Sequence, residues 1–133
     1  MADRYPDVVK TWRGLLKQNF TSWPENPDPS RSDTHAWSAH PTADLLRIVA
    51  GIRPGAAGYT SVIIAPHLGY LQRLDAASAH ANGLIRTRYA RNADGLRVEI
   101  DLPQGLSGRF ELDGQVRDLR SGQNRFVMRD PRR

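Results

Sequence analysis

The sequence contains no cysteine and only two lysines, and it has no long apolar run. Without cysteine the protein has no disulfide, no thiol nucleophile and no cysteine-ligated zinc site. No apolar run approaches the roughly 20 residues that a membrane-spanning helix needs, so we expect no membrane partner. The first residues lack the apolar stretch of a secretory signal. The compartment therefore stays unknown, with the cytoplasm expected if Met1 is the native start.

Because lysine is scarce, arginine supplies seventeen of the nineteen basic residues, and the formal net charge is +5. Most arginines alternate with apolar residues in strand-like runs, which is typical of a solvated surface. Phosphate contact is an alternative for the C-terminal group Arg125, Arg129, Arg132 and Arg133. No recognition-helix pattern and no aromatic RNA-binding motif accompanies this group. We therefore expect no nucleic-acid partner.

The length and overall composition are those of a small globular protein. Of the 133 residues, 39% are hydrophobic and 25% are charged, which is too apolar for a disordered chain. This length predicts one domain, or one small domain together with a remnant of another.

The first fifty residues show helical periodicity that is interrupted by a loop. Residues 6–19 place apolar side chains at helical spacing, with Pro6 in the first turn, where its missing N–H costs nothing. A second helix is expected over residues 38–50, ended by Gly51. Two such helices cannot bury their apolar faces on each other alone. They pack on the rest of the chain, self-associate through exposed faces, or belong to a larger helical array.

The rest of the chain has the period of two that is typical of strands. Residues 96–102 alternate apolar with charged side chains, which predicts a half-buried strand. Turns are indicated at Asn82-Gly83, Asp94-Gly95 and Asp113-Gly114, the first being the strongest hairpin signal. Short strands separated by turns about every ten residues predict an antiparallel β-sandwich. The fold class is therefore α+β, two N-terminal helices followed by this sandwich, with a boundary near residues 52–59.

The loop between the helices, residues 20–40, concentrates polar and aromatic groups. Aromatic rings stack on the apolar faces of sugars, and carboxylate, imidazole and guanidinium groups hydrogen-bond sugar hydroxyls. This mixture suits a carbohydrate site, and the alternative is a surface loop pinned by its own tryptophans. The side chains concerned are Trp23, Glu25, Asp28, Arg31, Asp33, His35 and Trp37.

Several segments together resemble one enzyme family. They are Phe20-Thr-Ser-Trp-Pro-Glu25, Ser30-Arg-Ser-Asp-Thr-His-Ala-Trp-Ser-Ala39, Asp44-Leu-Leu-Arg47, Gly51-Ile-Arg-Pro54, Gly58-Tyr59, Val62-Ile-Ile-Ala-Pro-His-Leu-Gly69 and Gly83-Leu-Ile85. In this order they resemble the end of the catalytic domain and the following β-sandwich of bacterial α-L-rhamnosidases. The likeness runs from about residue 8 to residue 128, which is nearly the whole chain.

The resemblance implies an inverting glycoside hydrolase with an (α/α)6 barrel followed by a jelly-roll-like sandwich. Residues 1–54 would be the C-terminal end of the barrel, a remnant of the catalytic domain, and residues 55–133 the sandwich domain. The expected partners are rhamnose-containing glycosides or oligosaccharides. No cofactor or metal is expected, because the four histidines are far apart in the sequence and no third ligand is evident.

The resemblance also assigns roles to residues of the loop. The family's Thr-Thr-x-x-Glu motif matches Thr21, Ser22 and Glu25, which makes Glu25 the candidate general base. His35 matches a histidine that contacts the sugar in the cleavage subsite. The remaining expected sugar-binding residues are Trp37, Arg31 and Trp23. Two departures from the family pattern are Ser22 for the second threonine and Pro24, which alters the expected path of the loop.

Glu25 alone does not complete an inverting mechanism. Inversion needs a general acid and a general base with their carboxyl groups about 6.5–9.5 Å apart. The family's acid lies upstream, in a part of the barrel that these residues do not match, and Asp33 more naturally orients Arg31 or caps a turn. We therefore expect the isolated chain to be inactive. The alternative function is a non-catalytic carbohydrate-binding or interaction module.

Overall fold

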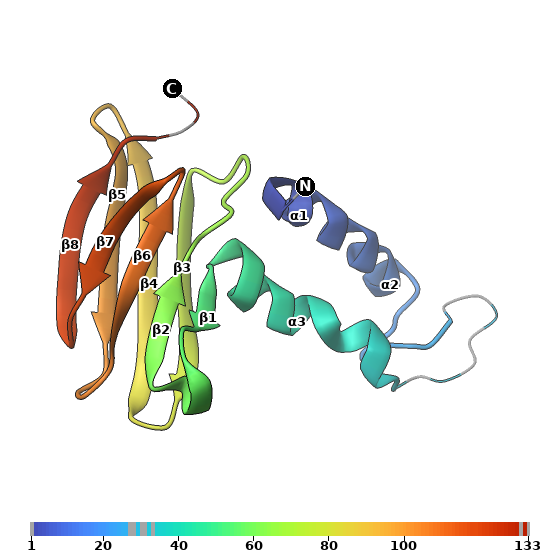
Figure 1. Cartoon of the computed structure of the whole chain (residues 1–133). Helices are drawn as coiled ribbons and strands as arrows, with labels where there is room; N and C mark the ends of the chain where they lie inside the picture. Colours follow the sequence, from blue (N-terminus) through green and yellow to red (C-terminus); the bar gives the residue numbers. More distant parts are fainter. Residues whose placement is uncertain (1, 27–28, 30–31, 33, 131, 133) are drawn as a thin grey trace.

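The protein consists of a helical hairpin beside a two-sheet β-sandwich, as seen in a computed structural model (Figure 1). The structure describes residues 2–26, 29, 32, 34–130 and 132. The hairpin projects from one side of the sandwich, and the loop between its two arms lies at the end farthest from the sheets (Figure 1). This α+β architecture is the one that the sequence predicts.

Two helical arms form the hairpin. The first is a nearly continuous run made of η1 (Ala2–Arg4), α1 (Tyr5–Val8), η2 (Val9–Trp12) and α2 (Arg13–Lys17), and the second is made of η3 (Ala36–Ala39), α3 (His40–Asp44) and the π-helical η4 (Leu45–Val49). Pro6 and Pro41 each lie in a first α-helical turn, where proline leaves no hydrogen bond unmade. Within the described part of the chain, no helix is long and apolar enough to cross a membrane.

Polar contacts hold the two arms side by side. The Tyr5 hydroxyl donates to Asp44 Oδ2 at 2.9 Å, and Trp12 Nε1 donates to the Ser38 carbonyl at 2.9 Å. The Trp12 ring also meets the His40 ring edge-on at 5.2 Å. Burial and the neighbouring Asp44 carboxylate raise the pKa of Tyr5 to about 12. These contacts fix the relative position of the arms.

In the part of the chain that the structure describes, eight strands form two four-stranded sheets. They are β1 (Ile52–Pro54), β2 (Ser61–Ile64), β3 (Arg73–His80), β4 (Gly83–Asn92), β5 (Gly95–Leu102), β6 (Ser107–Leu112), β7 (Gln115–Leu119) and β8 (Gly122–Met128), and a short 3-10 turn, η5 (Ala57–Tyr59), joins β1 to β2. The sheet orders are β1-β2-β6-β7 and β3-β4-β5-β8. All pairs are antiparallel except β2 with β6, which run parallel.

The predicted hairpin turns are present, but they differ in backbone conformation. Strands β3 and β4 join through Ala81 and Asn82, and of the expected pair Asn82-Gly83 only Gly83 has positive φ. The turn between β6 and β7 has φ 47° at Asp113 and φ 75° at Gly114. Positive φ at both central residues is the type I′ pattern, which matches the twist of a two-residue hairpin.

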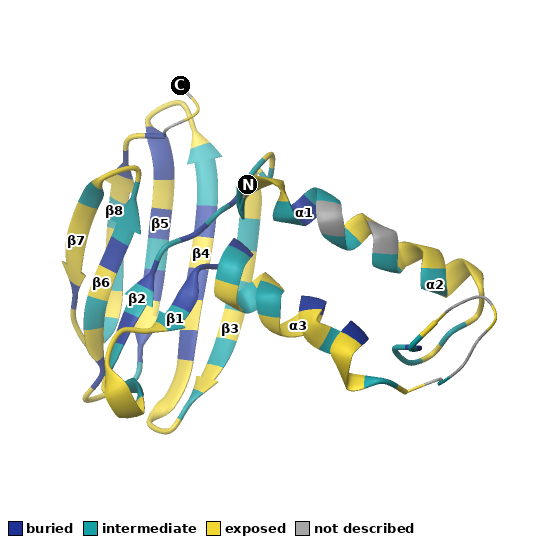
Figure 2. Ribbon diagram, turned by 45° about the vertical axis from the view of Figure 1, so that its right-hand side comes forward, coloured by how far each residue is buried: buried dark blue, intermediate teal, exposed yellow. Residues whose placement is uncertain are grey.

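The core lies between the two sheets and follows the predicted alternation. In β5, Leu96, Val98, Ile100 and Leu102 are buried, whereas the charged residues between them are exposed or half-buried, which gives the strand alternating colours (Figure 2). Phe110 on the opposite sheet is fully buried between the rings of Tyr89 and Phe126. The Tyr89 hydroxyl donates to the Ala50 carbonyl at 2.8 Å, so the core also anchors the end of the second helical arm.

A second anchor lies where β4 ends. The side chain of Arg91, only 11% exposed, forms an ion pair with the 5% exposed carboxylate of Asp130. Arg91 also donates to the carbonyls of Leu71 and Gly69, which belong to the loop before β3. Burial by itself would raise the pKa of Asp130, but hydrogen bonds from Arg91 and from the Arg132 backbone lower it below its usual value.

Replacing Asp130 by asparagine is expected to lower the free energy of unfolding by about 2 kcal/mol near neutral pH, because Arg91 loses its counter-charge in a buried position. The lowered pKa means that this contribution is complete above the usual aspartate pKa and is lost as the pH falls through the native value. Urea unfolding of both proteins at pH 6 and at about pH 2, well below the usual aspartate pKa, tests this expectation.

The matched control is Asp118→Asn, which removes an exposed carboxylate from β7. The difference in free energy of unfolding between wild type and D130N should become smaller in acid. The corresponding difference for D118N should stay near zero at both pH values. A gap for D130N that is equally large at both pH values would contradict the ion-pair interpretation.

Candidate functional site

The loop between the helical arms is closed at its neck by hydrogen bonds between its two sides. The His35 backbone N–H donates to the Trp23 carbonyl at 2.6 Å, and the Glu25 N–H donates to the Ser32 carbonyl at 2.7 Å. The hydroxyls of Ser22 and Thr34 are hydrogen-bonded at 3.1 Å. These bonds bring the two ends of the predicted site together, although about ten residues separate them in sequence.

Two aromatic rings continue the site into the second helical arm. His35 immediately precedes η3, and its ring meets the Trp37 ring edge-on at 6.3 Å. Trp37 is 56% exposed, which leaves much of its ring open to a ligand. The Nδ1 atom of His35 is buried, yet it has no hydrogen-bond partner in the part of the chain that the structure describes. Buried polar atoms are normally satisfied, and this nitrogen shares the exception with Arg53 Nε and Thr87 Oγ1 among the described residues.

The remaining candidate residues occupy different surroundings. Glu25 is partly exposed in the loop neck. Trp23 lines the apolar groove described below. Arg31, together with Asp28 and Asp33, lies outside the described residues. The structure therefore brings Glu25, His35, Trp23 and Trp37 to one end of the hairpin. It leaves their roles as predictions.

The largest hollow described is an apolar groove between the helical arms and strand β3. It has a volume of about 810 Å³, and its lining includes Trp12, Leu15, Leu16, Phe20, Leu45 and Leu74. Leu16 is 72% exposed and Leu45 is 42% exposed. Exposed apolar surface of this extent is unfavourable in water and usually marks a contact with other protein segments.

We expect this apolar groove to make the isolated chain self-associate. Replacing both Leu16 and Leu45 by glutamate should shift the protein towards monomer in sedimentation at about 100 μM chain, because burying a charged side chain in a contact between copies is costly. It should also lower the fluorescence of a bound hydrophobic dye at least about twofold. The matched control is Val116→Glu, at a 60% exposed position on β7. A wild-type chain that is monomeric at this concentration would contradict the expectation.

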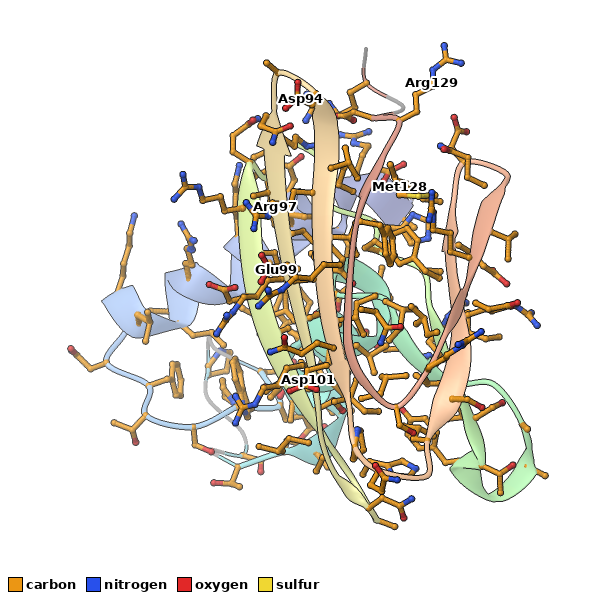
Figure 3. The ribbon with its side chains drawn as sticks, turned by 90° about the vertical axis from the view of Figure 1, so that its left-hand side faces the viewer. Asp94, Arg97, Glu99, Asp101, Met128 and Arg129 are labelled. Atoms are coloured by element: carbon orange, nitrogen blue, oxygen red, sulfur yellow. The ribbon has the colours of Figure 1, made fainter. Side chains whose placement is uncertain are left out.

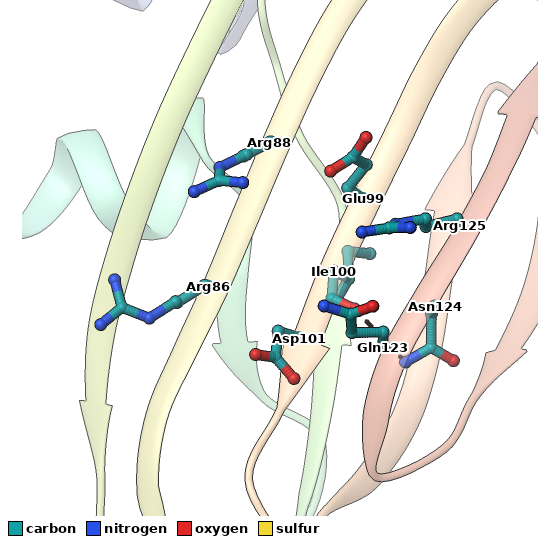
Figure 4. Close-up of a pocket in the computed structure, with 8 residues that line it drawn as sticks. All are labelled: Arg86, Arg88, Glu99, Ile100, Asp101, Gln123, Asn124 and Arg125. Atoms are coloured by element: carbon teal, nitrogen blue, oxygen red, sulfur yellow. Dashed lines mark hydrogen bonds between the residues drawn. The ribbon is translucent and has the colours of Figure 1, made fainter.

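Sequence reasoning missed one polar surface, on the outer face of the sheet formed by β3, β4, β5 and β8. Arg86, Arg88, Glu99, Asp101 and Gln123 line a hollow there (Figure 4). The alternating pattern of each strand predicts that these side chains point away from the core. Only the strand register shows that these side chains, which come from different strands, lie beside one another and line the same hollow.

A family model for the bacterial α-L-rhamnosidase C-terminal domain matches residues 51–126, more than half of the chain. The chain belongs to this family. The match begins at Gly51, where the second helical arm ends and the sandwich begins. It therefore covers nearly all of the sandwich and none of the helical hairpin. No curated protein sequence matches the chain.

Solved α-L-rhamnosidase structures share this fold. The enzyme from Aspergillus terreus matches 89% of the chain at 20% identity and a TM-score of 0.73. The GH78 family rhamnosidase of Bacillus sp. GL1 matches 81% at 25% identity and a TM-score of 0.68. The Streptomyces avermitilis α-L-rhamnosidase, solved in complex with L-rhamnose, matches 79% at 24% identity and a TM-score of 0.64.

These matches differ from the family match in their extent. Residues 51–133 make up less than two thirds of the chain, so a match over 89% of it extends into the helical hairpin. The chain in turn spans only 12%, 16% and 13% of the Streptomyces, Aspergillus and Bacillus structures. It therefore has the fold of a short part of a rhamnosidase, hairpin included.

Proposed function

We propose that this chain is the C-terminal portion of an α-L-rhamnosidase-like glycoside hydrolase, which cleaves terminal α-L-rhamnosyl linkages with inversion. The observation that carries the proposal is the extension of the structural match beyond the sandwich into the helical hairpin. A sandwich alone would support only an accessory role. The hairpin adds the loop on which the candidate active-site residues lie.

The chain up to Val49 is then the closing part of the catalytic barrel, and the sandwich domain begins with β1 (Ile52–Pro54), a few residues before the expected boundary after residue 54. The apolar groove supports this division, because the helical arms expose apolar side chains that the rest of a barrel would cover. The Tyr5–Asp44 and Trp12–Ser38 hydrogen bonds hold the arms in place without that cover.

In the proposed mechanism Glu25 accepts a proton from the attacking water, which adds to the anomeric carbon on the face opposite the leaving oxygen. His35 hydrogen-bonds a sugar hydroxyl through its imidazole ring, which lies edge-on to the exposed Trp37 ring. Trp37, Trp23 and Arg31 complete the sugar-binding set. The general acid that protonates the leaving oxygen comes from the larger part of the enzyme, so the isolated chain is expected to be inactive.

A chimera tests this proposal. Residues 1–133 replace the matching 13% of the Bacillus sp. GL1 rhamnosidase, and the product is assayed with an aryl α-L-rhamnoside. We expect the chimera to release the aryl alcohol and to form β-L-rhamnose first, which proton NMR resolves from the α anomer. The isolated chain should give no release above the blank. A folded but inactive chimera, or one that forms the α anomer first, would contradict the proposal.

A further inference from the structure

The outer face of the β3-β4-β5-β8 sheet carries polar side chains in three rows that cross the strands. The strand register places Arg73, Ala90, Arg97 and Val127 in one row, Asp75, Arg88, Glu99 and Arg125 in the next, and Ala77, Arg86, Asp101 and Gln123 in the third. Figure 3 shows Arg97, Glu99 and Asp101 following one another along β5 on this face.

The first two rows are partly explained by sheet stability. Arg88 pairs with Asp75 at 3.4 Å, and Arg97 pairs with Glu99 at 2.9 Å. The Arg88–Asp75 pair joins β4 to β3, and opposite charges on neighbouring strands stabilise a sheet modestly, whereas Arg97 and Glu99 both lie on β5. These contacts need no ligand.

The third row is different, because its polar groups are not used by the protein. Arg86 and Asp101 lie directly opposite each other on β4 and β5, yet they form no ion pair. Arg86 points towards β3 and away from Asp101 (Figure 4). Within the described part of the chain, the side chains of Arg86, Asp101 and Gln123 make no hydrogen bond, and neither does that of Arg125 at the end of the second row. Free donors and free acceptors therefore stand side by side.

Two adjacent hollows lie over these rows. One has a volume of about 170 Å³ and includes Arg86, Asp101, Gln123 and Arg125 in its lining. The other, of about 350 Å³, lies above the small side chain of Ala90. Arg88 and Glu99 line both hollows, so the two are neighbours with these side chains between them. The open surface is therefore elongated and extends beyond a single small-molecule pocket.

We propose that this outer sheet face binds a neutral oligosaccharide, as a second glycan site apart from the loop that carries Glu25. A sugar hydroxyl both donates and accepts, so it can accept from the guanidinium of Arg86 or Arg125 and donate to the Asp101 carboxylate. The amide of Gln123 can do either. The two adjacent hollows accommodate neighbouring sugar units of one chain, which passes over Arg88 and Glu99.

An anionic ligand fits this surface less well. The guanidinium groups would attract it, but Asp101 and Glu99 lie among them and would repel it. A neutral polyhydroxylated ligand satisfies the donors and the acceptors together. The mixture of charges thus favours a neutral glycan.

Binding to the intact chain tests the proposal. Two neutral probes are titrated by calorimetry and by amide NMR shifts, an oligosaccharide of L-rhamnose and one of glucose; the choice of rhamnose rests on the proposed function. The test variants are Asp101→Asn and Arg86→Gln. Their controls are Asp118→Asn and Arg120→Gln, which remove the same charges at exposed positions away from the hollows.

We expect binding of at least one probe, with shifts confined to β4, β5 and β8. D101N and R86Q should each raise the dissociation constant of that probe at least about tenfold, equivalent to about 1.4 kcal/mol. Neither variant should change the midpoint of thermal unfolding, and the two control variants should bind like the wild type. Binding of the glucose probe alone would support the glycan site and would count against rhamnose as its sugar.

Two results would overturn the proposal. One is the absence of binding by either neutral probe. The other is binding of a sulfated polysaccharide with an affinity that D101N increases and that falls steeply with salt concentration. This result would identify an anion-binding surface instead. Both results leave the rhamnosidase proposal standing, because that proposal depends on the helical hairpin and on Glu25.

Discussion

Replacing Glu25 by glutamine in the rhamnosidase chimera is expected to lower kcat for the aryl α-L-rhamnoside by about 10²–10⁴-fold. Glutamine has nearly the same size and keeps the backbone bond of residue 25 to Ser32, but it cannot accept the proton of the attacking water. Substrate binding depends on other groups, so KM should change little. Initial rates over a range of substrate concentrations separate the two effects.

Added azide gives a second readout of the same role. Azide attacks the anomeric carbon without losing a proton, so it needs no general base, and the aryl group leaves after protonation by the general acid. It should restore turnover in E25Q and yield a β-L-rhamnosyl azide. The control Glu111→Gln removes a carboxylate of β6 that pairs with Arg109 on the sandwich, and it should leave kcat unchanged. An E25Q chimera within about threefold of the unsubstituted chimera would remove Glu25 from the mechanism.

Replacing Gly51 by alanine is expected to lower the free energy of unfolding by about 4 kcal/mol, mostly through steric overlap. Gly51 has φ +78°, and a Cβ placed there would lie 2.2 Å from the carbonyl carbon of Ala65 and 2.4 Å from the nitrogen of Pro66. Those are backbone atoms that cannot rotate away. Gly51 also accepts the Ala65 N–H bond, so relieving the overlap breaks the junction between the helical arm and the sandwich.

Gly114→Ala separates the two causes. Gly114 has φ +75°, but a Cβ there would meet no atom within 4 Å. Its substitution should therefore cost only the left-handed strain of about 1–2 kcal/mol. Chemical denaturation of both variants measures the difference. Equal losses would mean that backbone conformation alone, and not the approach of Ala65 and Pro66, requires glycine at position 51.

The fold was largely predictable because its signals are local. Leu96, Val98, Ile100 and Leu102 alternate with charged residues, and this alternation alone identifies the buried face of β5. Turn residues show where strands end, although Asn82-Gly83, the strongest signal, adopted positive φ only at Gly83. The parallel pairing of β2 with β6 was not predicted, since it joins segments more than forty residues apart and depends on how the two strands meet.

The residues of the candidate catalytic loop were selected from the sequence for a different reason, and their roles stay predictions. These residues lie close together in sequence and match a family motif, so Glu25 and His35 were identified before their surroundings were known. The Arg91–Asp130 pair spans 39 residues, and no local pattern distinguishes these two from the other charged residues. Long-range pairs of this kind depend on chain geometry that periodicity does not encode.

The sequence by itself determined the α+β class, the strand faces, the family and the arginine-rich surface. The tertiary structure decided which of the surface groups stand together. Strand register set Arg86 opposite Asp101 and Gln123 beside Asp101, and the hairpin left Leu16 and Leu45 exposed along one groove. The physical reason is that burial and periodicity are properties of single segments. A binding surface depends instead on the relative position of several segments.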